Sequence, residues 1–160
     1  MKQQRQIVGV DIENLTRTPS PTKSNAANVA IQLGEILQLA PGDVVLVSGN
    51  PNNREACEAA ASILGGSVEC QRGPNGADLV INSKVAFACC WNGRAGDKPF
   101  DLVTIASGDG IFAATAAWVK LSGLRVRFVA HKETVHRTIL DVADQVTFLD
   151  VRTPVDASYR

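Results

Sequence analysis

Two aspartates follow apolar segments of the kind that form buried strands. Asp11 comes directly after the apolar residues 7–10, and Asp109 comes shortly after the apolar residues 102–106. Because an open α/β sheet binds ligands beyond the carboxyl ends of its strands, we expect the two carboxylates to be neighbours. Carboxylates about 4 Å apart repel by roughly 4 kcal/mol at an effective dielectric of about 20. Such a pair is protonated, solvated or bridged by a cation, and a divalent metal is the simplest solution.

Polar residues beside these aspartates suit a hard metal ion. Glu13 and Asn14 supply a second carboxylate and an amide that either binds substrate or orients Asp11, and Asp109 lies between two glycines. Oxygen ligands of this kind favour Mg²⁺ or Mn²⁺. The structural alternative is that Asp and Asn complete turns and cap helices at these positions.

A third aspartate, Asp78, falls in the first turn of a helix predicted over residues 77–91. Taken alone, its carboxylate is best explained as complementing the helix dipole. Together with Asp11 and Asp109, it becomes a third member of an acidic cluster if this helix starts at the carboxyl end of the sheet. We therefore predict that all three aspartates share one site.

The spacing of apolar residues predicts a regular alternation of strands and helices. This alternation requires a mostly parallel sheet with right-handed crossovers and helices on both faces. We predict an α/β fold, a doubly wound, Rossmann-like sheet of about five or six strands. Strands are expected at 6–12, 43–48, 67–70, 101–107, 124–130 and 145–149, and helices at 24–40, 53–64, 77–91, 110–122 and 134–143.

Length and composition indicate one globular domain. The 160 residues predict a single domain over 1–152, followed by a mobile tail over 153–160. The 16 basic and 16 acidic residues balance, so any nucleic-acid contact must be local. Residues 120–137 carry a local basic excess. No apolar stretch approaches the roughly 20 residues of a membrane span, and no signal-peptide core is present, so we expect a cytoplasmic protein without membrane contact.

The motifs occur in the order found in one nuclease family. Residues 10–14 (Val-Asp-Ile-Glu-Asn), 76–78 (Gly-Ala-Asp), 107–112 (Ser-Gly-Asp-Gly-Ile-Phe) and 121–129 resemble the NYN family of PIN-like nuclease domains, and the similarity extends over about residues 6–149. The resemblance implies a metal-dependent endoribonuclease that hydrolyses phosphodiesters of single-stranded RNA with a metal-activated water. It implies that Asp11, Asp78 and Asp109 hold Mg²⁺ or Mn²⁺, and we assign substrate contacts to Asn14 and Ser107.

One position departs from the family pattern. Similar domains often carry another aspartate two residues after the Asp109 position, where this chain has Ile111. We expect Ile111 to be buried in the core, where it would contribute about 1.5–3 kcal/mol. This departure and the neutral charge favour an alternative, a catalytically degenerate domain that binds RNA or a protein partner, including a second copy of the chain. A weaker alternative is a haloacid-dehalogenase-like phosphohydrolase with Asp11 as nucleophile, because Glu13 stands where that family has an aspartate.

The two histidines, His131 and His136, lie in the basic stretch and outside the acidic motifs. A metal-activated water needs no histidine base. We therefore predict that neither histidine is catalytic and that both lie at the surface or contact phosphate.

Overall fold

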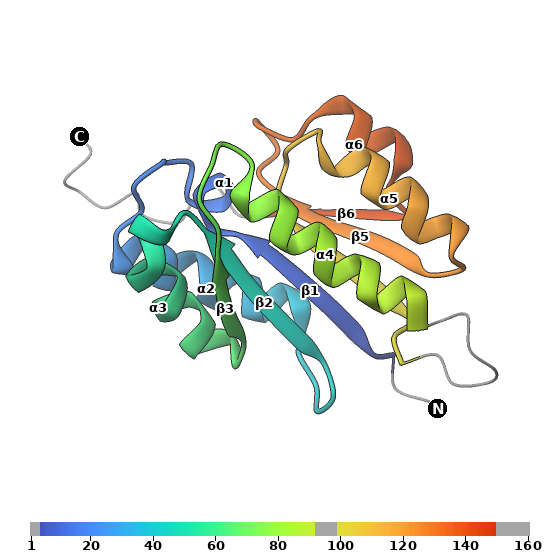
Figure 1. The fold of residues 1–160 in the computed structure, drawn as a ribbon, viewed down its shortest axis with the longest axis horizontal. Helices are drawn as coiled ribbons and strands as arrows, with labels where there is room; N and C mark the ends of the chain where they lie inside the picture. Colours follow the sequence, from blue (N-terminus) through green and yellow to red (C-terminus); the bar gives the residue numbers. More distant parts are fainter. Residues whose placement is uncertain (1–3, 92–98, 150–160) are drawn as a thin grey trace.

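Six parallel strands form one sheet in the order β3-β2-β1-β4-β5-β6 (Figure 1). The computed structural model describes residues 4–91 and 99–149, so the predicted tail and the predicted end of the domain lie outside the described residues. This order is that of a Rossmann-like doubly wound fold, which confirms the predicted fold class. The strands are β1 (Gln6–Asp11), β2 (Val44–Gly49), β3 (Ser67–Cys70), β4 (Leu102–Ala106), β5 (Arg125–Ala130) and β6 (Gln145–Phe148).

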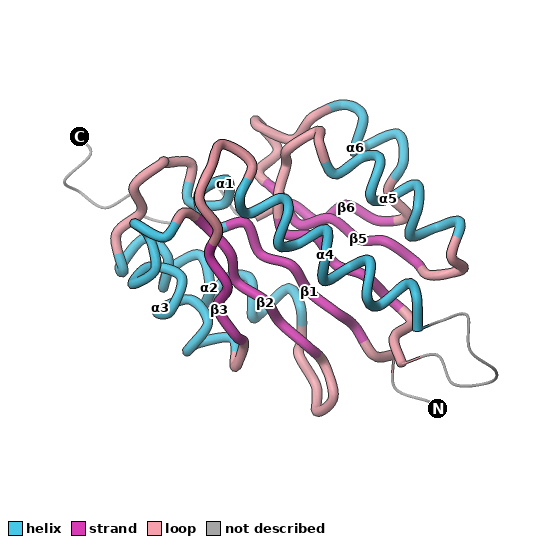
Figure 2. Tube along the Cα trace, in the orientation of Figure 1, coloured by secondary structure: helices cyan, strands magenta, loops and turns pink. Residues whose placement is uncertain are grey.

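Helices cover both faces of the sheet, as predicted (Figures 1 and 2). One core contains Leu33 and is formed with α2 (Lys23–Leu37) and α3 (Arg54–Leu64). The core on the opposite face contains Phe112 and Phe128. Its helices are α4 (Gly76–Trp91), α5 (Phe112–Leu121) and α6 (Arg137–Val142). Among the described residues, no helix has the length and apolarity that crossing a membrane requires.

The strands nearest the centre of the sheet are buried along their whole length. Every residue of β1 and of β4 is buried. A parallel strand between two helical layers has no solvent-facing side. For this reason the sequences of these two strands are almost continuously apolar. The two strands pair directly, with Val10 opposite Ala106, so their carboxyl ends lie next to each other.

A short helix follows β1 where the sequence predicted the last residue of a strand and then a connection. This helix, α1 (Ile12–Thr16), is capped by Asp11, whose Oδ1 accepts a hydrogen bond from the Asn14 backbone N–H at 3.3 Å. It ends at Arg17 in the left-handed conformation. A run of only five helical residues is too short to show the apolar period of a helix, so the sequence pattern could not reveal it.

Gly9 sets how closely α4 approaches the sheet. A Cβ atom added at Gly9, within β1, would lie 2.6 Å from Cγ2 of Ile81 in α4, which is closer than real contacts allow. Ile81 lies one helical turn after Asp78, at the start of the same helix. The missing side chain of Gly9 therefore allows the first turn of α4 to lie close to the strand that ends at Asp11.

We expect Gly9→Ala to destabilise the protein by about 1–3 kcal/mol, because it overpacks this contact. Ile81→Ala alone should cost about 2–5 kcal/mol through the cavity that it leaves. The double variant should be more stable than the sum of the two effects predicts, because each change relieves the other. Urea unfolding of the four proteins measures this coupling, and additive free energies would contradict the close contact.

Candidate active site

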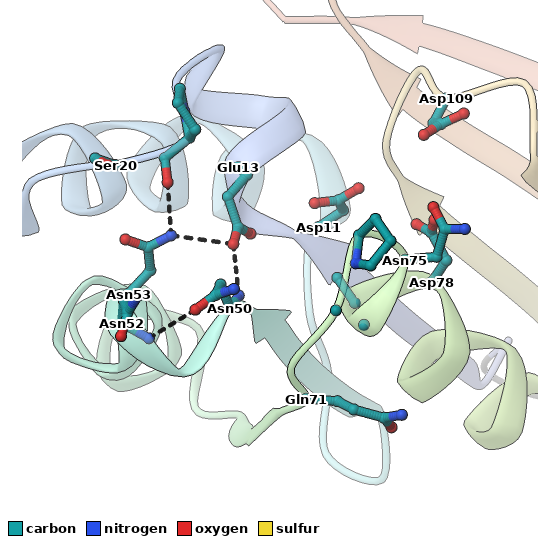
Figure 3. A pocket seen from close by; sticks show the side chains of 15 residues that line it. Asp11, Glu13, Ser20, Asn50, Asn52, Asn53, Gln71, Asn75, Asp78 and Asp109 are labelled. Carbon is teal, nitrogen blue, oxygen red and sulfur yellow. Dashed lines mark hydrogen bonds between the residues drawn. The ribbon is translucent and has the colours of Figure 1, made fainter.

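A pocket of about 360 Å³ lies at the carboxyl ends of the strands (Figure 3). Side chains with carboxylate, amide or hydroxyl groups dominate its lining, and none of the described residues that line it is Lys, Arg or His. An anionic substrate would therefore meet only negative and neutral groups there. The polar residues of the lining are Asp11, Glu13, Ser20, Asn50, Asn52, Asn53, Gln71, Asn75, Asp78 and Asp109.

Asp11 is a buried carboxylate at the end of β1, and only 7% of it is exposed. Ser107 donates its hydroxyl hydrogen to Oδ2 of Asp11 at 3.3 Å, and the backbone N–H of Asn14 donates to Oδ1. Burial raises the pKa of Asp11 to about 7, and the charges of Asp78 and Glu13 add to the increase. The hydrogen bonds oppose this increase without cancelling it, because removal from water dominates.

Asp78 lies in the first turn of α4 and is also buried. Burial raises its pKa to about 6, and the negative charges of Asp109 and Glu13 raise it further. Asp109 lies on the exposed loop after β4, where its Oδ1 accepts a hydrogen bond from the Ile111 N–H at 3.1 Å. The structure thus brings Asp11, Asp78 and Asp109 to the lining of one pocket, as the sequence predicted.

The three carboxylates share a pocket but do not meet at one point. Across residues 4–91 and 99–149, no three His, Cys, Asp or Glu side chains are grouped closely enough to hold a metal ion as they stand. Mutual repulsion favours separation of Asp11, Asp78 and Asp109, and Asp109 is held by its bond to the Ile111 N–H. Binding of one ion by all three would therefore require rotation of side chains.

Asn14 and Ser107, which we expected to contact substrate, form hydrogen bonds that connect α1 and β1 to the loop after β4. Asn14 accepts a hydrogen bond from the Gly108 N–H through its Oδ1 at 2.8 Å. Ser107 is fully buried, and its Oγ also accepts a bond from the Asp109 N–H at 3.2 Å. Neither side chain belongs to the pocket lining. Both therefore orient the aspartates, and contact of either side chain with a substrate stays a prediction.

A second wall of the pocket was missed by the sequence analysis. Oε1 of Glu13 accepts hydrogen bonds from the Asn50 backbone N–H and from Nδ2 of Asn53, the latter at 3.1 Å. Asn53 also donates to the Pro19 carbonyl oxygen at 2.9 Å. Oε2 of Glu13 is buried and has no hydrogen-bond partner among the described residues. Glu13 therefore anchors residues 50–53 beside the acidic groups (Figure 3). The available signal was the Asn-rich segment Asn50-Pro-Asn-Asn53 after the second strand.

The expected burial of Ile111 is wrong. Its side chain is 42% exposed, and it precedes α5, whose first residue, Phe112, occupies the buried position instead. The buried residues of α5 are Phe112, Ala116 and Val119, which follow helical spacing. Adjacent residues of a helix point about 100° apart, so Ile111 lies off the face that Phe112 buries. Ile111 therefore stands at the surface beside Asp109.

The expected surface position of His131 is also wrong, because only 6% of this residue is exposed. Its Nε2 donates to the Leu15 carbonyl oxygen at 2.6 Å, and burial lowers its pKa. This bond ties the end of β5 to α1. His136, in contrast, is exposed, as expected.

Comparisons with known proteins bear on the fold alone. No protein-family model matches this chain, and no curated protein matches it. The crystal structure of a protein of unknown function from Vibrio parahaemolyticus is similar, with a TM-score of 0.64 and 17% sequence identity over 94% of this chain and 98% of that chain. This similarity supports the Rossmann-like α/β fold, and the resemblance to the NYN family stays a prediction.

The raised pKa of Asp11 predicts that the metal-free protein loses stability as the pH rises. Between about pH 4 and 7 the folded state keeps a proton that the unfolded state releases, so raising the pH through this window favours unfolding. The increase in pKa from 3.8 to about 7 corresponds to at most roughly 4 kcal/mol. Asp11→Asn should flatten this dependence. Urea unfolding in a chelator on either side of the window measures it, and parallel pH profiles for the two proteins would contradict the assignment.

Proposed function

We propose that this protein is a divalent-metal-dependent endoribonuclease of the NYN, PIN-like type. One observation carries the proposal: four acidic residues line a pocket at the carboxyl ends of β1 and β4 without a basic residue among the described lining. The phosphodiester of an RNA substrate is itself an anion. It can approach these carboxylates only if a cation lies between them.

The donor set fits Mg²⁺ or Mn²⁺. Asp11, Asp78 and Asp109 offer hard carboxylate oxygens, and the raised pKa values of Asp11 and Asp78 reflect burial and like charge that a cation would offset. A bound ion would supply an activated water and neutralise charge on the scissile phosphate. Ser107 orients Asp11 by donating its hydroxyl hydrogen.

Dinucleotide binding, a common function of this strand order, is disfavoured at the same place. That function requires a glycine-rich turn after β1 and a helix N-terminus free to receive pyrophosphate. Here the turn contains Asp11 and Glu13, and the Asp11 carboxylate already caps α1. Two negative side chains would repel a pyrophosphate.

Single-stranded RNA is the substrate that the size of the pocket favours. A volume of about 360 Å³ lies at the small end of the range for ligand pockets, so we propose that the pocket takes one nucleotide of a single strand. The absence of a membrane-spanning helix among the described residues is compatible with a cytoplasmic site of action, which we include in the proposal.

The second candidate is a catalytically degenerate domain that binds RNA or a protein partner. Two observations favour it: the acidic residues are not gathered into a ready metal site within the described chain, and Ile111 replaces an acid expected in the family. The two candidates differ in one measurable property. An enzyme cleaves RNA when metal is added, whereas a degenerate domain only binds.

We expect the protein to cleave single-stranded RNA in Mn²⁺ or Mg²⁺, and we expect Asp109→Asn to lower the rate by about a hundredfold or more through lost metal binding. The amide keeps the shape of the side chain, so the fold should remain intact. Glu35→Gln is the control, because Glu35 is an exposed acid on α2, outside the pocket and away from α6. Thermal melts should show a larger Mn²⁺-induced rise for the native protein than for Asp109→Asn. Undiminished cleavage by Asp109→Asn would refute this role, and cleavage by neither protein would favour the degenerate domain.

Ile111→Asp should strengthen metal binding, because it places another carboxylate beside Asp109 at an exposed position. We expect Mn²⁺ affinity to rise by roughly tenfold, which is about 1.4 kcal/mol. Stability should change by no more than about 0.5 kcal/mol, since the position is outside the core. Ile111→Asn controls for the loss of the apolar side chain, and calorimetric titration measures both variants. Equal affinities for the two variants would show that position 111 does not face the metal.

A further inference from the structure

The two sides of Asp109 differ in charge. On one side lies the pocket, whose described lining contains no Lys, Arg or His. On the other side lie the connection from β5 to α6, with Lys132 and His136 exposed, and the first residue of α6, the exposed Arg137. Glu133 is the acid of this connection, and it pairs with Arg17 at 3.9 Å. A chain that carries regularly spaced phosphates would therefore meet exposed cationic groups on this second side.

His136 lies directly against the loop that carries Asp109. Its backbone N–H donates to the Gly108 carbonyl oxygen at 2.9 Å. A Cβ atom added at Gly110 would lie 2.8 Å from Cγ of the His136 ring, so the ring covers this glycine closely. The imidazole is thus held beside the glycine that follows Asp109 in the chain.

Hydrogen bonds also fix the tautomer of His136. The backbone N–H of Thr138 donates to Nδ1 at 3.2 Å, and the Thr138 hydroxyl lies 2.8 Å from the same atom. Because Nδ1 accepts, the proton of the neutral ring lies on Nε2. The side chain is exposed, and no hydrogen bond of Nε2 occurs within the described chain. Nε2–H is therefore a donor for an acceptor from outside the protein.

We propose that residues 132–137 bind the backbone of single-stranded RNA, and that Nε2–H of His136 donates to the phosphate next to the scissile one. This inference rests on the proposed function, which places the scissile phosphate at the carboxylates. Lys132 and Arg137 supply positive charge along the same segment, while His136 supplies a donor in a fixed position. The path of the RNA therefore runs from the acidic pocket across Asp109 to α6.

Two substitutions at position 136 separate the donor from the structural role of the ring. His136→Asn retains an acceptor near the position of Nδ1 for the Thr138 N–H and removes the Nε2–H donor. His136→Gln places an amide N–H near the position of Nε2. We expect His136→Asn to weaken RNA binding in a chelator by roughly tenfold and His136→Gln to bind more tightly than His136→Asn. In Mn²⁺, His136→Asn should raise KM and leave kcat unchanged.

The charged residues are tested through the salt dependence of RNA binding. The logarithm of RNA affinity falls as the logarithm of the salt concentration rises. Lys132→Ala and Arg137→Ala should each make this slope less steep by about 0.7, the value for one phosphate contact to a single strand. Arg125→Ala is the matched control, because Arg125 is exposed at the opposite end of β5. It should leave the slope unchanged. Fluorescence anisotropy with a labelled single-stranded RNA measures all of these variants.

The outcomes separate this inference from the proposed function. If the native protein cleaves RNA but the variants at 132, 136 and 137 bind and cleave as it does, the RNA path is wrong and the nuclease stands. An Arg125→Ala effect as large as that of Arg137→Ala would also overturn the path, because the attraction would then be non-local. If the native protein neither binds nor cleaves RNA, both proposals fail, and a protein partner becomes the better explanation of the basic segment.

Discussion

The burial of the Asp11 carboxylate is the constraint on which the rest of the site depends. A carboxylate removed from water is disfavoured unless it is hydrogen-bonded, protonated or paired with a cation. Asp11 is satisfied in part by Ser107, from the end of β4, and by the Asn14 N–H, from α1. Because its donors come from two different elements, satisfying Asp11 also fixes how those elements lie relative to each other.

The same hydrogen bonds that hold the fold also hold the acidic groups apart. Asn14 accepts from the Gly108 N–H, and this bond sets the path of the loop toward Asp109. On the opposite side, Glu13 holds the Asn50 N–H and the Asn53 amide. The fold therefore keeps the carboxyl groups of Asp11 and Asp78 in one pocket, where burial and like charge disfavour their charged forms and raise both pKa values. Sites of this kind reduce the stability of the free protein, which a bound cation would restore.

The placement of β1 and β4 in the sheet could be predicted from the sequence, because it depends on the alternation of strands and helices and not on contacts between particular side chains. A doubly wound sheet has its topological switch point between the first and fourth strands, so Asp11 and Asp109 could be predicted to approach one pocket, and β1 does pair with β4. What could not be predicted depends on contacts between distant segments. The contact of Glu13 with Asn53 requires the chain to turn into α1 directly after β1, and the burial of His131 requires the Leu15 carbonyl as a partner. Ile111 was misplaced because it and Phe112 belong to one apolar run, in which the sequence does not show that Phe112 is the buried residue.

The overall charge of zero does not argue against a polyanionic ligand in this fold. Net charge governs attraction at distances beyond about 10 Å, whereas a bound phosphate responds to the groups next to it. Here the acidic groups face the pocket, and exposed cationic side chains lie on residues 132–137. Positive and negative charges therefore cancel over the whole chain but not within either of these two surfaces. Weak attraction at long range disfavours non-specific binding along any anionic surface. In the proposed function, selectivity would then come from whether a nucleotide can enter the pocket while its neighbouring phosphates reach the basic segment.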